Sequence, residues 1–287
     1  MASWPRRQVG KAARSHRGGE VAVRASFKDG SGAVLLFAFD GANWNPKVLA
    51  ASGANAGFAG ATWSKFGPPS IGTEGTVAIL ADVKGGSATK SANSAIVLLS
   101  ESAASVKIAM EGETNAELGA NYKSFSDPVA ASDGQIAFTA KLAGGSVSKS
   151  NDTALFWRNS VGELVTIART GTAAPETNGA TWKKLINFAL PSGDTAGPII
   201  LAEIGGSGVA RKSNLGLWAR NSSGTLTLLA RAGFPLSVNG VPMVVSKLAL
   251  LNPLPPVHGS TRSFNDAGRV VYLATFKDGT QAIMTAR

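Results

Sequence analysis

Three segments of the 287-residue chain place lysine, serine and asparagine in the same order, and these side chains can hydrogen-bond to a ligand. The segments read GGSATKSANSA, GGSVSKSNDTA and GGSGVARKSNLG, and their candidate ligand-binding residues are Lys90, Asn93, Lys149, Asn151, Lys212 and Asn214. Their donors suit a polysaccharide or another polyanionic or hydroxyl-rich ligand. Alternatively, Asn and Ser bond to the nearby backbone and organise a hairpin, while Lys remains in solvent. The sequence leaves both interpretations open.

The acids and histidines form no recognisable catalytic set. His16 and His258 lie outside the repeated pattern described below, which disfavours a Ser-His-Asp triad or a histidine metal site. Glycosidases need only a pair of carboxylates, and Glu111, Glu113 and Glu117 are close enough in sequence to share one face. Calcium-loop and nucleotide-binding motifs are absent from the sequence. The sequence predicts no catalytic residues, no metal site and no cofactor.

The net charge of +10 is concentrated at the N-terminus. Residues 1–24 contain one acid, Glu20, and six basic residues: Arg6, Arg7, Lys11, Arg14, Arg17 and Arg24. This basic arm, Arg6–Arg24, indicates either a solvated terminus or a nucleic-acid contact, of which nucleic acid is the less favoured partner. No apolar run approaches the roughly 18–20 residues of a transmembrane helix, and the N-terminus lacks the apolar region of a signal peptide.

Three sequence markers recur with a period of about 60 residues, which indicates tandem repeats. Aligned alanines end a strand-like segment at Ala25, Ala81, Ala140, Ala202 and Ala274. The pattern of alanine, two residues and glycine ends at Gly53, Gly112, Gly171 and Gly233. The motif GATW or GANY begins at Gly60, Gly119 and Gly179. Asp82, Lys141, Glu203 and Thr275 share the position after the aligned alanine and differ in charge, which predicts an exposed, variable position.

Within one unit, alternation and turn residues predict four consecutive antiparallel strands. In the third unit three of them are Gln135–Leu142, Ala154–Arg158 and Leu164–Arg169, after a segment that opens at Tyr122. Tryptophans at repeated positions are expected to pack between neighbouring units, namely Trp63, Trp157, Trp182 and Trp218. The repeats therefore predict an all-β fold whose units pack on one another.

Five copies of the aligned strand predict a β-propeller of about five four-stranded blades. It forms a single repeat domain over residues 1–287, with units of about 1–60, 61–119, 120–179, 180–240 and 241–287, the last of them incomplete. Either Ser3-Trp4 or the VGKAAR segment (residues 9–14) is expected to complete the last unit and close the ring. The alternative is an open, β-solenoid-like array of the same units.

The segments FNDAGRVVYLATFKDG and ASDGQIAFTAKLAGGS resemble bacterial tandem-repeat proteins that carry an NxxGxxAF signature. Asn265 and Gly268 match its first half, and Gly134, Ala137 and Phe138 match its second half. The resemblance implies a propeller-like repeat, export and an extracellular or cell-surface location. It supplies no catalytic residues, and the function of that family is largely uncharacterised. The sequence shows no signal-peptide or C-terminal anchor pattern, so on this point the chain is expected to depart from that family.

Two functions follow from these observations. The favoured one is a non-catalytic propeller that serves as an exported or surface-associated binding or structural module, with a polysaccharide or a protein as partner. It rests on repetition without a distinctive set of acids or histidines, so the sequence leans against an enzyme. The alternative is a polysaccharide-active hydrolase or lyase with carboxylates that face the central channel.

Overall fold

The computed structural model describes residues 13–15, 19–72, 75–131, 134–191, 197–221, 223–250 and 270–286. Their regular structure consists of β-strands and one short 3-10 helix, η1 (Arg211–Ser213). The strands form five sheets of consecutive antiparallel strands, with four main strands in each. The prediction of an all-β, propeller-type chain of five four-stranded units is therefore confirmed. No helix in the described ranges has the length and hydropathy needed to span a membrane.

The strands follow the order of the chain. The first sheet contains β1 (Ala13–Ser15), β2 (Glu20–Ser26), β3 (Gly32–Phe39) and β4 (Trp44–Ala51). The second contains β5 (Thr62–Phe66), β6 (Ser70–Ile71), β7 (Val77–Lys84), β8 (Ser94–Leu99) and β9 (Val106–Met110). The third contains β10 (Thr114–Asn115), β11 (Ala120–Phe125), β12 (Val129–Ala130), β13 (Ile136–Ala143), β14 (Thr153–Arg158) and β15 (Leu164–Arg169). The fourth contains β16 (Thr181–Ala189), β17 (Ile199–Gly205), β18 (Leu215–Arg220) and β19 (Leu226–Arg231). The fifth contains β20 (Pro235–Val238), β21 (Val241–Leu250), β22 (Val270–Phe276) and β23 (Gln281–Ala286).

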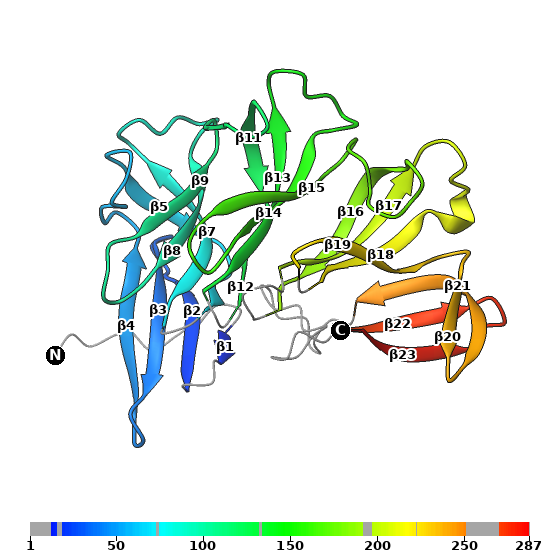
Figure 1. Cartoon of the computed structure of the whole chain (residues 1–287). Coiled ribbons are helices and arrows are strands. Elements are labelled where there is room, and N and C mark those ends of the chain that lie inside the picture. The colour runs from blue at the N-terminus through cyan, green and yellow to red at the C-terminus, as the bar shows by residue number, and fades with distance from the viewer. Residues whose placement is uncertain are drawn as a thin grey trace.

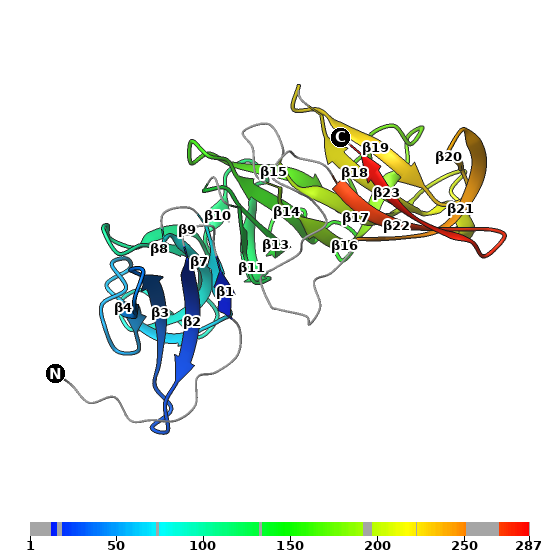
Figure 2. The ribbon, with the colours of Figure 1, turned by 90° about the horizontal axis from the view of Figure 1, so that it is seen from below.

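The five sheets follow one another around an arc, from the first sheet in blue to the last in orange and red (Figure 1). The view from below also places the first and last sheets at opposite ends (Figure 2). Strand β1 pairs with β2, from Ala13 opposite Val23 to Ser15 opposite Val21, so it belongs to the first sheet. Of the two segments expected to close a ring, Ser3-Trp4 and residues 9–12 of VGKAAR lie outside the described residues, whereas Ala13 and Arg14 of VGKAAR pair with the first sheet and not with the last.

Each pair of neighbouring sheets encloses its own hydrophobic core. Val34 and Leu36 of the first sheet share a buried cluster with Ile79 of the second. A second cluster joins the second and third sheets, a third joins the third and fourth, and a fourth joins the fourth and fifth. Because an inner sheet is covered on both faces, its central strand is a continuous apolar run rather than an alternating one. In β7, Val77 and Ile79 face the first sheet and Ala78 faces the third.

The repeated tryptophans lie in these cores, as predicted. Trp182 and Trp218 are fully buried between the third and fourth sheets, with ring centroids 4.5 Å apart in an edge-to-face arrangement. The Trp218 indole N–H donates to the carbonyl oxygen of Pro175 at 3.0 Å, and the Trp157 N–H donates to Gln135 Oε1 at 2.6 Å. Both buried donors are thus paired, which removes the cost of desolvating them.

The glycine markers mark the passage from one sheet to the next. Gly53, Gly112, Gly171 and Gly233 all have φ between 82° and 84°, a conformation that glycine adopts without strain. The backbone N–H of Gly53 donates to the carbonyl oxygen of Trp63, and the other three glycines repeat this bond to Tyr122, Trp182 and Val245 at 2.7–2.8 Å. The glycine that ends the alanine-x-x-glycine pattern and the aromatic residue of GATW or GANY therefore recur together because their backbones are hydrogen-bonded to each other.

The double glycines of the long hairpins meet the turn before the preceding strand. The N–H of Ser87 donates to the carbonyl oxygen of Ala59 at 2.9 Å, and a methyl group on Gly86 would lie 2.0 Å from that oxygen. In the third sheet a methyl group on Gly145 would lie 2.8 Å from the carbonyl oxygen of Gly119. The close approach of two backbones therefore requires glycine at the second position of the pairs in the second and third sheets.

Replacing Gly86 by alanine is expected to destabilise the chain by more than the roughly 1 kcal/mol that a positive φ alone costs, because of the clash with Ala59. Gly85→Ala is the matched control, since Gly85 also has a positive φ (78°) but has no atom within 4 Å of the added methyl group. Urea unfolding of both variants measures the difference. Equal losses of stability would contradict the packing role of Gly86.

Candidate functional site

A groove of about 1100 Å³ lies between the hairpin ends of the third and fourth sheets. The β13–β14 hairpin contributes Lys149 and Ser150, and β16 contributes Thr181, Trp182 and Lys183. The fourth sheet adds Glu203 and Ile204 of β17, then Val209, Arg211 and Asn214 of the β17–β18 hairpin. Buried Trp182 and Ile204 lie at its base, whereas the three cations are exposed. The two long hairpins thus face one space.

The polar side chains of this groove are available to a ligand. Within the described part of the chain, Lys149, Lys183, Glu203, Arg211 and Asn214 make no side-chain hydrogen bond or ion pair. Three positive charges face one negative charge, so the groove attracts anions. Glu203 is the only carboxylate among the described lining residues, and it is half-buried.

Glu203 differs from its counterparts in the repeat. At the same position of the second sheet, Asp82 accepts a hydrogen bond from Ser94 Oγ at 2.7 Å. In the third sheet, Lys141 pairs with Asp152 at 2.8 Å. The groove therefore contains the copy of this position that has no internal partner. The sequence prediction of a merely exposed, variable position missed this difference.

The six residues predicted to bind a ligand do not form one site. Lys149 and Asn214 line the groove, whereas Lys90, Asn93, Asn151 and Lys212 do not. Lys90 and Lys212 are exposed. The carbonyl oxygen of Asn93 accepts the N–H of Val83 at 2.8 Å, within its own hairpin. The structure thus brings together two of the six candidates and adds Lys183, Glu203 and Arg211 to them.

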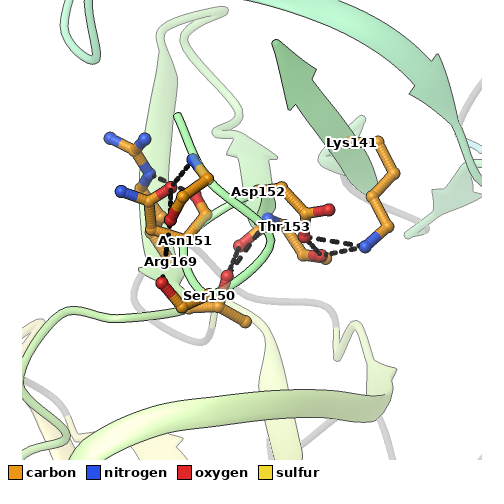
Figure 3. A network of polar contacts seen from close by, with 8 residues as sticks. Lys141, Ser150, Asn151, Asp152, Thr153 and Arg169 are labelled. Atoms are coloured by element: carbon orange, nitrogen blue, oxygen red, sulfur yellow. Dashed lines mark hydrogen bonds and ion pairs between the residues drawn. The ribbon is translucent and has the colours of Figure 1, made fainter. Parts of the chain in front are cut away.

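Asn151 organises the hairpin that carries Ser150 (Figure 3), and Lys149 lies in the same hairpin. Its Oδ1 accepts the N–H of Ser148 at 2.6 Å, and its Nδ2 donates to the carbonyl oxygen of Ser146 at 3.2 Å. Arg169 Nε donates to the backbone oxygen of Asn151 at 2.9 Å. Here the hairpin interpretation of asparagine holds, because the whole side-chain amide is used inside the loop.

Asp152 anchors the same hairpin to β13 (Figure 3). Its Oδ1 accepts hydrogen bonds from Lys141 Nζ and from Thr153 Oγ1, each at 2.8 Å. Burial of the carboxyl raises its pKa, but the bonds from Lys141 and Thr153 outweigh burial and hold the pKa below its usual value. The ionised form is therefore the one that the fold stabilises.

Replacing Asp152 by asparagine is expected to lower the free energy of unfolding by less than about 1 kcal/mol at pH 7, because Lys141 is half exposed and the pair is screened. Since the pKa of Asp152 is depressed in the folded state, its contribution is present above the unfolded pKa of about 3.9 and disappears as the pH falls through the folded value. Denaturation of both proteins at several pH values tests this. A gap that persists at pH 2 would contradict it.

The three glutamates that could have shared one face are bound to separate partners. Glu111 Oε2 lies 3.4 Å from the N–H of Ser94, Glu113 pairs with Lys107, and Glu117 Oε2 accepts from Thr166 Oγ1 at 2.8 Å. Among the described residues, no cluster of three or more His, Asp or Glu could hold a metal ion.

Both histidines lie outside the described residues, as does most of the basic arm. Arg24 of that arm is part of β2 and donates to the carbonyl oxygen of Phe66 at 3.1 Å.

Residues 8–287 match DUF7453, a family of unknown function, and the chain belongs to that family. No curated protein matches its sequence. An α-L-arabinanase from Penicillium chrysogenum, solved with arabinobiose, is 13% identical with a TM-score of 0.39, over 96% of this chain and 74% of the enzyme. The α-L-arabinofuranosidase Arb93A from Fusarium graminearum is 9% identical with a TM-score of 0.37, over 93% of this chain and 71% of the enzyme.

The prediction of a non-catalytic binding or structural module is corrected at this point. The two matched structures are of an arabinanase and an arabinofuranosidase, and this finding is at odds with that prediction. Within the chain, the sequence argument treated this repeat position as uniform, whereas Glu203 lacks the side-chain partner that Asp82 and Lys141 have.

Proposed function

We propose that this DUF7453 protein cleaves an acidic polysaccharide by β-elimination in the groove between its third and fourth sheets. The observation that carries the proposal is the unpaired Glu203 carboxylate beside three unpaired cations in one groove. Charged groups without internal partners are the groups that a charged substrate can engage at little cost to the fold.

The cations favour a polymer of uronic acids as substrate. Lys149, Lys183 and Arg211 come from two hairpins and one strand, so they present charge to several sugar units rather than to one. The guanidinium of Arg211 can bind a carboxylate through two parallel hydrogen bonds. Exposed positive charge also accelerates the encounter with an anionic chain.

The single carboxylate favours elimination over hydrolysis. Glycosidases place two carboxyl groups about 5–10 Å apart, and the described lining of the groove contains one. In β-elimination a base removes the proton at C5 of a uronate. The C–H electrons form the C4–C5 double bond, the C4–O bond breaks, and the leaving oxygen takes a proton. Glu203 supplies the base, and the cations stabilise the charge that develops on the uronate carboxylate.

The test is to incubate the purified chain with polygalacturonate, alginate and a neutral arabinan. We expect one of the acidic polymers to yield products that absorb in the ultraviolet, because elimination creates a conjugated double bond. New reducing ends without this absorbance would assign hydrolysis instead. No product from either acidic polymer, under conditions in which a known lyase cleaves them, would refute the proposal.

A further inference from the structure

In the first and last sheets, one apolar face packs against no other sheet among the described residues. Residues directly opposite each other on paired strands point to the same face. In the first sheet Leu35 lies opposite Val48, Phe37 opposite Pro46, and Phe39 opposite Trp44. Phe39, Trp44 and Val48 are each about half exposed. These six residues form an apolar surface on the side of the sheet that faces away from the second sheet.

The corresponding surface of the last sheet lies on β22 and β23. Leu273 is opposite Ile283, and Val271 is opposite Thr285, on the face that does not pack against the fourth sheet. The Ile283 side chain is 70% exposed. A large aliphatic side chain in mid-strand with this exposure marks a surface that lacks a partner.

The repeat identifies what that partner is. In each sheet, the strand that follows the aligned alanine has a residue that faces the next sheet, directly after the residue paired with that alanine: Val34, Ile96, Leu155, Leu217 and Ile283. The residue after it faces the preceding sheet: Leu35, Val97, Phe156, Trp218 and Met284.

In each of the four internal junctions, the forward residue of one sheet shares a hydrophobic cluster with the backward residue of the next. The pairs are Val34 with Val97, Ile96 with Phe156, Leu155 with Trp218, and Leu217 with Met284. The four forward residues are at most 1% exposed. Ile283 and Leu35 are the two members of this series that have no counterpart. They are the two halves of a fifth contact of the same type.

We propose that the last sheet of one chain packs on the first sheet of a second copy of this chain, with Ile283 against Leu35. A second copy is the occupant because the two sheets lie at opposite ends of the arc (Figures 1 and 2). The contact is head-to-tail, so it joins different surfaces of the two copies. It does not involve the groove, and it stands independently of the proposed enzyme activity.

Cysteine cross-linking tests the contact, because the chain contains no cysteine. Leu35→Cys and Ile283→Cys are prepared as separate proteins, mixed and treated with a short bis-maleimide cross-linker. We expect a cross-linked heterodimer, because sheets that pack face to face lie about 10 Å apart, a separation that such a linker spans. Val161→Cys mixed with Ile283→Cys is the control, because Val161 is highly exposed in the β14–β15 turn and belongs to neither surface. No heterodimer above this control would overturn the proposal.

Two further measurements separate this contact from closure of a single chain. Light scattering of the native chain should give a mass above 29.2 kDa that rises with concentration, and Ile283→Asp should reduce it to one chain. Ile283 is exposed within its own chain, so this variant should remain folded, which circular dichroism checks. A native mass of one chain at every concentration would overturn the proposal. So would a double Leu35→Cys/Ile283→Cys protein that cross-links within one chain on dilution.

Discussion

Replacing Glu203 by glutamine should lower the rate of cleavage of an acidic polysaccharide by about 10²–10⁴-fold, the usual contribution of a general base. Glutamine retains the size and hydrogen-bonding capacity of the side chain but cannot accept the proton. Because Glu203 has no partner among the described residues, the change should leave the free energy of unfolding almost unchanged. Initial rates measured from the absorbance of the unsaturated product quantify the effect.

The control for this experiment is the Glu101→Gln variant. Glu101 is an exposed acid of the second sheet that pairs with Lys47 of the first sheet. The control variant should retain full activity. Substrate affinity of the Glu203 variant should change little, since the cations that hold the polymer remain. A Glu203→Gln protein with native activity would exclude Glu203 as the base while leaving the groove as a candidate binding site.

Replacing Trp218 by alanine should cost about 3–5 kcal/mol of stability, as expected for a large aromatic side chain in a packed core. Trp218 is completely buried, and its ring packs so closely on Gly216 that a methyl group there would lie 2.4 Å from it. The substitution also removes the hydrogen bond to Pro175 and the edge-to-face contact with Trp182. Urea unfolding measures the loss.

Trp44→Ala provides the matched comparison, since it removes the same side chain from a surface where it is about half exposed. It should cost markedly less than Trp218→Ala. Equal losses in the two variants would mean that the junction between the third and fourth sheets contributes no more than a surface contact. The core assignment would then be wrong.

Local sequence signals predicted the strands well because each unit repeats the same turn chemistry. The predicted segment Leu164–Arg169 coincides with β15, and Gln135–Leu142 differs from β13 by one residue at each end. The alternation of apolar and polar residues and the Gly-Gly turns are short-range features, so they can be recognised in the sequence without knowledge of the tertiary structure. Two of the three sequence markers reflect a backbone hydrogen bond that recurs at the first three junctions, from Gly53, Gly112 and Gly171 to Trp63, Tyr122 and Trp182.

The groove was predicted only in part because its residues come from two units. Lys149 and Asn214 belong to the repeated hairpin motif, whereas Lys183 lies outside it and Arg211 lies within its third copy at a position that carries no cation in the other two. Glu203 was dismissed because its repeat position varies in charge. Whether the carboxylate at that position is hydrogen-bonded depends on its neighbours in space, such as Ser94 beside Asp82. The sequence pattern does not contain that information.

The separate core of each junction implies that the interactions of the chain are mainly between neighbouring units, as in a one-dimensional array. A small rotation of the third sheet against the fourth would change the cluster around Trp182 and Trp218 but leave the hydrogen-bonded ladders of both sheets intact. Because the groove lies across this junction, such a hinge would widen or narrow it directly. The width of the groove would therefore depend on the angle between the two sheets as well as on the two hairpins that line it.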